Sequence, residues 1–461
     1  MLKGKHFSPN QVVALTFLGL ILAGAFLLML PISHRDGMWM PFLDALFTAT
    51  SASCVTGLVV CDTGKVFSLF GQLVIIGLIQ LGGLGLMLFA TLFSVALGRR
   101  INLQDRMLIQ ASLNQNDMSG VVRMSLRVAK YTAVVEGVLG TALALRFYQQ
   151  FGLKGIYYGY WHAISAFCNA GFDLFGNYQS LVGYVHDPVV NGLIALLIIL
   201  GGIGFAVMSD VVHTRHFRNY RLHTKLVLVS TVALIALGTL LIQVMEFDNG
   251  RTLGTLSVGD QWMASFFQSV SARTAGFNTF DLMQMRTSTI LVMVLLMVIG
   301  ASPASTGGGI KTTTAALLIL SAHQVLFQKP ECVIFGRRID QETIHRAFAI
   351  TTLSIIWIFL AIIGITYLEE TSLVEALFEV VSAYATVGLS SGLSQHLTAG
   401  GKIIMILSMY AGRVGIMTFV MALTARRRAL DRNYEQKETV CCLGPGAFWR
   451  VRCGNPGRNG P

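Results

Sequence analysis

Four copies of one short segment recur along this chain, and each copy ends at a glycine. The glycines are Gly57, Gly171, Gly276 and Gly388. Ten positions before each of them stands an aromatic residue, namely Phe47, Trp161, Phe266 and Phe378, and three copies have serine six positions before: Ser51, Ser165 and Ser382. One isolated glycine is usually a packing residue or a helix end. Four glycines with an aromatic residue at a fixed offset instead predict a fourfold pore.

The composition places these segments in a membrane. Hydrophobic residues make up 54% of the 461 residues and charged residues 12%, whereas about a quarter of a soluble domain is charged. Runs long enough to cross a hydrocarbon core of about 30 Å lie near 12–30, 71–97, 128–147, 190–212, 226–245, 289–320, 346–367 and 402–423. We therefore predict an all-α membrane protein with eight transmembrane helices. No cleavable signal peptide is evident, so the first span is expected to remain.

Positive charge gathers after every second span. The basic residues there are Arg99, Arg100 and Arg106; Arg215, Arg218, Arg221 and Lys225; Lys329, Arg337, Arg338 and Arg346; and Arg426, Arg427 and Arg428. The positive-inside rule predicts that these loops and both termini face the cytoplasm. Topology thus accounts for the net charge of +11, and we expect no nucleic-acid partner. The seven cysteines indicate neither a disulfide framework nor a metal site.

Each glycine segment falls between the two spans of a pair. The stretches 41–58, 157–172, 262–277 and 373–389 are apolar but too short to cross as helices, so they are expected to enter the membrane and return. We predict four units of span, re-entrant pore helix, filter and span around one pore. Their boundaries are 1–98, 99–213, 214–322, with an interrupted inner helix at 300–312, and 323–425. Residues 426–461 lack apolar periodicity and are predicted to be a disordered tail.

The residues at each glycine are those expected to bind a cation. Potassium is coordinated by rings of backbone carbonyls, and the potassium-channel signature is T-V-G-Y-G. Thr386-Val387-Gly388 matches its first three residues, and the other copies read Val55-Thr56-Gly57, Asn169-Ala170-Gly171 and Thr274-Ala275-Gly276. Pore helices that direct their C-termini inward, with Asp173 and Asp281 just beyond two filters, favour cations.

A second pattern recurs in the spans that follow the filters. It reads Gly82-Gly83-Leu84-Gly85, Gly201-Gly202-Ile203-Gly204 and Gly412-Arg413-Val414-Gly415. Close helix packing is the favoured interpretation of the glycines. An arginine in mid-span is costly and normally faces a cavity or a partner. Arg413 is therefore expected to place a positive charge below the filter.

The third span that follows a filter is interrupted by small and polar residues. After residue 299 it contains Gly300, Ser302, Pro303, Ser305, Thr306, Gly307, Gly308, Gly309 and Lys311, and only then does an apolar run resume. The helix should unwind there. Ile310 separates Gly309 from Lys311, so the stretch is not a phosphate-binding loop, and we expect no nucleotide on this chain. A movable plug under the filter and a passive kink are the two interpretations.

The four-copy layout, the single glycine per filter and the interrupted third inner helix resemble the Trk/Ktr/HKT superfamily of potassium transporters, in particular the Ktr-type membrane subunits. The resemblance covers residues 8 to 425. It implies potassium uptake across the bacterial cytoplasmic membrane through a single-chain pore. The loop 300–312 would be the intramembrane gate and Arg413 a barrier in the cavity. In plant members a serine at the first filter goes with sodium transport, so Gly57 favours potassium.

The resemblance also implies partners. Members form homodimers with one pore per protomer, embedded in membrane lipid, and are regulated by a cytosolic KtrA-type ring that binds ATP or ADP. Some members are stimulated by sodium, which leaves sodium coupling open. The family usually ends soon after the fourth inner helix, so the tail puts in doubt any role of the C-terminus in dimer or ring contacts.

Two other classes of function remain as alternatives. A secondary active symporter explains eight spans and a broken helix, but such folds usually arise from two inverted repeats. An enzyme needs a nucleophile, a metal cluster or an acid pair, and no such constellation is evident. Glu136, inside a span with Arg127, Lys130 and Arg146 on the same helix, is interpreted as structural.

Overall fold

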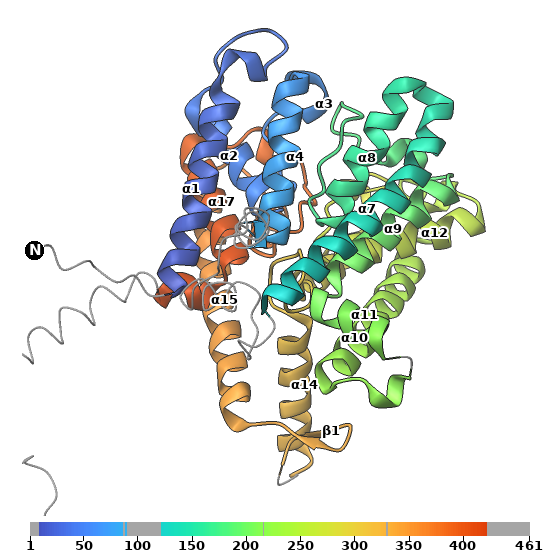
Figure 1. The fold of residues 1–461 in the computed structure, drawn as a ribbon, viewed down its shortest axis with the longest axis vertical. Coiled ribbons are helices and arrows are strands. Elements are labelled where there is room, and N and C mark those ends of the chain that lie inside the picture. The colour runs from blue at the N-terminus through green and yellow to red at the C-terminus, as the bar shows by residue number, and fades with distance from the viewer. Residues whose placement is uncertain (1–8, 86–87, 90–120, 215, 329–330, 422–461) are drawn as a thin grey trace, which may run out of the picture.

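The computed structural model describes residues 9–85, 88–89, 121–214, 216–328 and 331–421 (Figure 1). The predicted tail lies outside these ranges, as do several basic residues: Arg99, Arg100, Arg106, Arg215, Lys329 and Arg426 to Arg428. The described residues are mainly helical, and one order of elements occurs four times. A long helix is followed by a short helix, an extended segment that carries one of the four glycines, and a further helix.

The first two copies of this order occupy the N-terminal half of the chain. They comprise α1 (Pro9–Met29), η1 (Pro31–Ser33), α2 (Phe42–Ser53), α3 (Thr63–Val66) and α4 (Leu69–Leu84), and then α7 (Val121–Phe151), α8 (Leu153–Phe167), η2 (Val182–Tyr184), α9 (Pro188–Gly202) and α10 (Phe205–His213).

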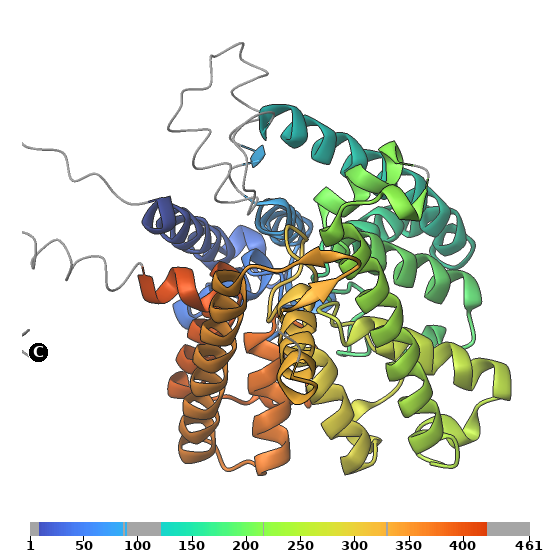
Figure 2. The ribbon, with the colours of Figure 1, turned by 90° about the horizontal axis from the view of Figure 1, so that it is seen from below.

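The last two copies follow after η3 (Phe217–Asn219). They comprise α11 (Leu222–Glu246), η4 (Leu253–Thr255), α12 (Val258–Ser271), η5 (Leu282–Gln284), α13 (Thr287–Val298) and α14 (Thr312–Leu326), and, after a hairpin of β1 (Val333–Ile334) and β2 (Arg337–Arg338), α15 (Gln341–Leu368), α16 (Leu373–Tyr384), η6 (Leu393–Gln395) and α17 (Ala399–Val414). Figure 2 shows the copies following one another around a central region in chain order.

The helices lie where the spans were predicted, but several predicted spans are formed by shorter or broken helices. Four described helices are long and apolar enough to cross a membrane: Gln11–Met29, Val122–Phe151, Leu222–Glu246 and Gln341–Leu368. These are the first helix of each copy. The second helices are shorter or broken, with α9 and α10 meeting at 98°, and Leu69–Leu84, Thr287–Val298 and Thr312–Leu326 form shorter apolar helices.

The expectation that only the third inner span is interrupted is wrong. Helices α4, α9 and α17 also stop at or just before the last glycine of the recurring pattern, where φ is 88° at Gly85, 92° at Gly204 and 90° at Gly415. A φ in this range is incompatible with a continuing right-handed helix and favours glycine. The right-handed helix therefore ends at one equivalent position in these three inner segments.

The first glycine of the same pattern has a different role. A Cβ added to Gly82, Gly201 or Gly412 would overlap the carbonyl oxygen of Ser53, Phe167 or Tyr384 respectively. These carbonyls lie at the C-terminal ends of the short helices α2, α8 and α16. Glycine thus lets each inner helix pack directly on the end of a short helix, in agreement with the close-packing interpretation.

Two of the short helices, α12 and α16, begin at a serine cap, and all four bury at least half of their residues. The Ser372 hydroxyl accepts a hydrogen bond from the Glu375 N–H and the Glu375 side chain reaches back to the Ser372 N–H, which makes a capping box at the start of α16. At the start of α12 the Ser257 hydroxyl accepts a hydrogen bond from the Asp260 N–H. Two hydrophobic clusters surround them, one mainly from the first two copies and the other mainly from the last two. Both clusters include residues of the short helices. The four glycine segments, which follow these helices, therefore lie between the two clusters.

Candidate functional site

The four glycines meet in a closed ring. A Cβ placed on Gly57 would lie 3.2 Å from the Cα of Gly171, and one on Gly171 would lie 2.9 Å from the Cα of Gly276. The ring continues from Gly276 to the Cα of Gly388 at 3.2 Å and closes from Gly388 to the Cα of Gly57 at 2.9 Å. Residues more than 300 positions apart are thus neighbours, in chain order around the ring.

The backbone is alike in the four segments. The residue two before each glycine has a positive φ although it is not glycine: 57° at Val55, 59° at Asn169, 69° at Thr274 and 52° at Thr386. The glycines have φ values of 97°, 70°, 79° and 89°, and the residue between does not have a positive φ. Alternation of this kind turns successive carbonyls toward the same side of the chain, and strain at four equivalent positions marks a functional segment.

The carbonyl oxygens of the middle residues point at the ring. The oxygens of Thr56, Ala170, Ala275 and Val387 each lie against the glycine of the adjacent copy, where a Cβ would collide with them. A ring of backbone carbonyls without side chains between them is the arrangement that replaces the water shell of potassium. The structure therefore brings together all twelve residues that the sequence placed at the filter.

The recurring serines hold this backbone. Ser51 and Ser382 accept hydrogen bonds from the N–H groups of Gly57 and Gly388, both at 3.1 Å, and Ser165 donates to the Phe172 carbonyl at 2.8 Å. In the third copy Ser271, only five residues before Gly276, donates to the Phe277 carbonyl. The third segment is thus one residue shorter between its serine and its glycine.

That shift corrects one sequence assignment. Phe266, aligned with the other aromatic residues, is 37% exposed, whereas Phe267 is fully buried like Phe47 and Phe378. The buried aromatic residue of the third copy therefore lies nine residues before its glycine and not ten, since this copy is one residue shorter than the others.

Two side chains that sequence reasoning missed fix the segments after the glycines. Glu379 is fully buried on α16, and its carboxylate accepts hydrogen bonds from the N–H and hydroxyl groups of Ser391 and Ser394 and from the Ser390 hydroxyl. At the equivalent position of α8, His162 Nε2 accepts from the Leu174 N–H at 3.3 Å. The sequence feature that could have identified Glu379 is a carboxylate in an otherwise apolar short helix, directly after the recurring aromatic residue Phe378.

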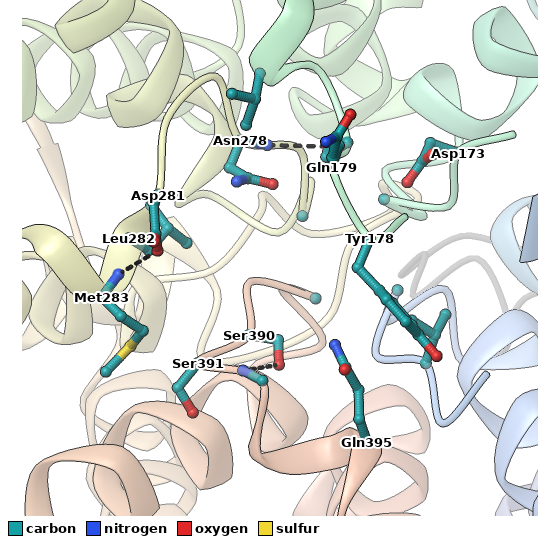
Figure 3. A pocket seen from close by; sticks show the side chains of 18 residues that line it. Asp173, Tyr178, Gln179, Asn278, Asp281, Leu282, Met283, Ser390, Ser391 and Gln395 are labelled. Atoms are coloured by element: carbon teal, nitrogen blue, oxygen red, sulfur yellow. Dashed lines mark hydrogen bonds between the residues drawn. The ribbon is translucent and has the colours of Figure 1, made fainter. Parts of the chain in front are cut away.

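A cavity of about 400 Å³ opens above the ring and is lined by all four glycines (Figure 3). Asp173 and Asp281 both line it, as their positions beyond two of the filters suggested. Burial, reinforced by the nearby Asp62 carboxylate, raises the pKa of Asp173 to about 6. The two acidic side chains in its lining make the cavity suited to cations.

The interrupted inner segment lies on the other side of the ring. Helix α13 ends at Val298 and α14 begins at Thr312, and the Gly300 N–H bonds to the Ile310 carbonyl at 2.9 Å across the base of the loop. Near the glycine ring the Gly308 N–H donates to the Thr386 hydroxyl at 3.0 Å, and a Cβ on Gly307 would overlap the Thr274 hydroxyl. The loop thus touches the side chains directly below two of the four glycines.

The same loop is bonded to the second copy. The Thr306 hydroxyl donates to the Phe167 carbonyl at 3.2 Å, and the Ser302 N–H donates to the Gly202 carbonyl at 3.0 Å. Ser305 instead bonds back to Ser302, and Lys311 Nζ donates to the Gly307 and Gly308 carbonyls at 2.7 and 3.4 Å. The ammonium group of Lys311 therefore bonds to backbone carbonyls of the loop that contains it. Gly309, with φ 69°, packs against Ala385.

Arg413 connects three copies at one point. Its guanidinium donates to the Thr306 carbonyl of the loop and to the carbonyls of Gly82 and Gly83, the last at 2.9 Å. All three acceptors are backbone carbonyls, and no ion pair to Arg413 is found within the described ranges. Arg413 thus provides both a charge and a cross-link below the ring.

Glu136 lies apart from this region. Both of its carboxylate oxygens accept hydrogen bonds from the Gln80 amide on α4, at 3.1 and 3.0 Å, and the Cys168 thiol donates to the Gln80 carbonyl oxygen. The hydrogen-bond partner is thus an amide on a neighbouring helix, in agreement with the structural interpretation of Glu136.

Carbonyl-lined segments enclosed by apolar helices are the features of a membrane protein that passes cations. The family model of TrkH, described as a cation transport protein, matches residues 7–429, and the chain belongs to this family. It is 45% identical over 423 residues to the Ktr system potassium uptake protein B of Bacillus subtilis (strain 168), covering 92% of this chain and 94% of that protein.

Two further relatives and one solved structure extend the comparison. The chain is 40% identical to the Ktr system potassium uptake protein B of Vibrio alginolyticus, covering 91% and 92% of the two chains, and 38% identical to the potassium/sodium uptake protein NtpJ of Enterococcus hirae, covering 95% and 98%. The crystal structure of the potassium transporter TrkH from Vibrio parahaemolyticus superposes with a TM-score of 0.73 at 18% identity, covering 92% and 86%. That likeness concerns the fold.

Proposed function

We propose that this protein carries out potassium uptake across the bacterial cytoplasmic membrane through one channel-like pore per chain. The observation that carries the proposal is the ring of carbonyl oxygens from Thr56, Ala170, Ala275 and Val387, closed by four glycines. In this proposal eight spans and four re-entrant helices, α2, α8, α12 and α16, form four units with boundaries near residues 98, 213 and 322. Both termini face the cytoplasm. The names of the relatives support potassium as the ion.

Ion flux into proteoliposomes tests this function. Purified protein should accumulate potassium and rubidium down their gradients far faster than sodium, and without an imposed sodium gradient. Uptake that requires a sodium gradient would instead favour a symporter. This alternative is tested because one relative is named a potassium/sodium uptake protein. Stimulation by sodium without such a requirement is compatible with the pore.

The loop between α13 and α14 is proposed to be the gate. Removing Ser305 through Gly308 deletes the Thr306 bonds to Phe167 and the Gly308 bond to Thr386, and leaves fewer atoms below the ring. We expect potassium flux to rise at least about tenfold, a change of about 1.4 kcal/mol in barrier. Flux equal to that of the parent, in a variant that inserts and folds normally, would make the segment a passive kink.

The cytoplasmic face is proposed to bind a nucleotide-dependent regulatory ring, and the chain to form a homodimer. Lys225 Nζ lies 5.8 and 5.9 Å from the ring centroids of Phe217 and Phe335, joining the start of α11 to the β hairpin. Arg218, Arg221, Arg337 and Arg338 flank this contact in the sequence, and Figure 1 shows α10, α14 and β1 at one end of the molecule, away from α3. A cationic, aromatic surface of this kind suits an anionic protein partner.

Affinity capture from the native membrane tests the partner. We expect a soluble ATP- or ADP-binding protein to be recovered with the chain, and Arg337→Glu with Arg338→Glu to reduce its recovery at least about tenfold. If captured complexes never contain such a protein, and ATP and ADP leave flux in native membranes unchanged, this part of the proposal fails.

A further inference from the structure

A second, smaller pocket lies beside the mouth of the ring, at the seam between the first two copies. Its volume is about 30 Å³, enough for one water-sized particle. It shares Gly57, Gly171 and Asp173 with the larger cavity, and adds Asp62, which the larger cavity does not reach. Two carboxylate-bearing residues from different copies therefore line one very small space.

Asp62 has one oxygen that the protein leaves unsatisfied. Its Oδ1 accepts the Lys65 N–H at 3.1 Å and so caps α3. Its Oδ2 is buried and has no hydrogen-bond partner among the described residues, and the residue as a whole is 7% exposed. The nearby ammonium group of Lys65 bonds instead to the Asn177 side chain. A buried carboxylate oxygen without a donor is costly and normally has a cation or a proton as its partner.

Asp173 completes the anionic wall. Its Oδ1 accepts the Phe175 N–H at 3.0 Å, which fixes the side chain on the loop between α8 and η2. The Asp62 carboxylate acts on Asp173 through space and disfavours its ionised form. Two carboxylates that line one small pocket repel each other when both are ionised, and a cation between them would relieve that repulsion.

We propose that this pocket binds one divalent cation that prefers oxygen ligands, of the Mg²⁺, Ca²⁺ or Mn²⁺ class, beside the ion path and not within it. Carboxylates, carbonyls and water are the ligands that this class prefers. Within the described ranges no three His, Cys, Asp or Glu side chains gather to hold a metal, so backbone oxygens of the lining, and water from the adjoining larger cavity, would complete the coordination. Two carboxylates match the charge of a divalent ion.

Binding would have two consequences. The ion would tie the segment after Gly57 to the segment after Gly171, and it would neutralise negative charge at the mouth. We therefore expect external divalent cations to raise, several-fold, the potassium concentration needed for half-maximal uptake at low ionic strength. Asp62→Asn should remove this dependence on divalent cations.

The direct test is equilibrium binding of radioactive Ca²⁺ to the purified full chain in lipid nanodiscs, with 100 mM potassium present to occupy the filter. We expect about one Ca²⁺ per chain, displaced by Mg²⁺ and Mn²⁺. Asp62→Asn and Asp173→Asn keep the oxygens that accept the Lys65 and Phe175 N–H groups, so both variants should fold, yet each should weaken binding at least about tenfold. Asp281→Asn, which removes a mouth carboxylate outside the pocket, should leave binding unchanged.

Several results would overturn the proposal. They are absence of Ca²⁺ binding by the parent protein, equal binding by both pocket variants, or competition by potassium that tracks occupancy of the filter. Displacement by sodium but not by Mg²⁺ would also overturn it, because the site would then be monovalent. The assay measures binding and not flux, so its failure leaves the proposed potassium uptake untouched.

Discussion

Replacing Gly388 or Gly57 with serine is expected to lower the preference for potassium over sodium by at least about tenfold, or 1.4 kcal/mol. A Cβ on Gly388 would overlap the Thr56 carbonyl oxygen, and one on Gly57 would overlap that of Ala170. Each substitution displaces a carbonyl of the ring and enforces a positive φ on a residue that disfavours it. Paired potassium and sodium flux in proteoliposomes measures the ratio.

The chain offers a matched control for this experiment. Gly392 has φ 92°, close to the 89° of Gly388, but a Cβ there would meet nothing within 4 Å. Gly392→Ser therefore imposes similar backbone strain without touching the ring, and should keep the parent's ion preference. If Gly388→Ser and Gly57→Ser fold normally and also keep it, these glycines do not form the filter.

Replacing Arg413 with alanine is expected to raise potassium flux by about tenfold to a hundredfold. At an effective dielectric constant near 20, a unit charge about 6 Å from a permeating cation opposes it by roughly 3 kcal/mol, which corresponds to roughly a hundredfold in rate. The substitution also removes the bonds to the carbonyls of Thr306, Gly82 and Gly83. It therefore releases the loop and deletes the charge together.

Arg413→Lys separates these two effects. Lysine keeps the positive charge but lacks the planar fork that reaches three carbonyls. Flux near the parent value in the lysine variant would assign the barrier to charge, whereas flux near that of the alanine variant would assign it to the cross-link. If the alanine variant inserts normally and conducts no faster than the parent, Arg413 is only a structural anchor.

The sequence predicted which glycine segments belong together, and the structure brings these segments into one ring, but the sequence misplaced one of the residues that support them. The recurrence of glycine and serine is a local pattern, so it was visible without a structure. The one-residue shortening in the third copy was not visible, because Ser271 and Phe267 are recognised only by what they contact and by their burial. Likewise Gly204 was read as a packing residue, since a positive φ leaves no mark on hydropathy.

By itself the sequence determined that the chain is a helical membrane protein with four short segments ending in glycine, because apolar length and repeat spacing are properties of neighbouring residues. Only the tertiary structure decided which groups meet. Arg413 and Gly82 are 331 positions apart, and Asp62 and Asp173 belong to different copies. Their contacts depend on how four helical units close around one centre, which sets the distances between residues that no local pattern relates.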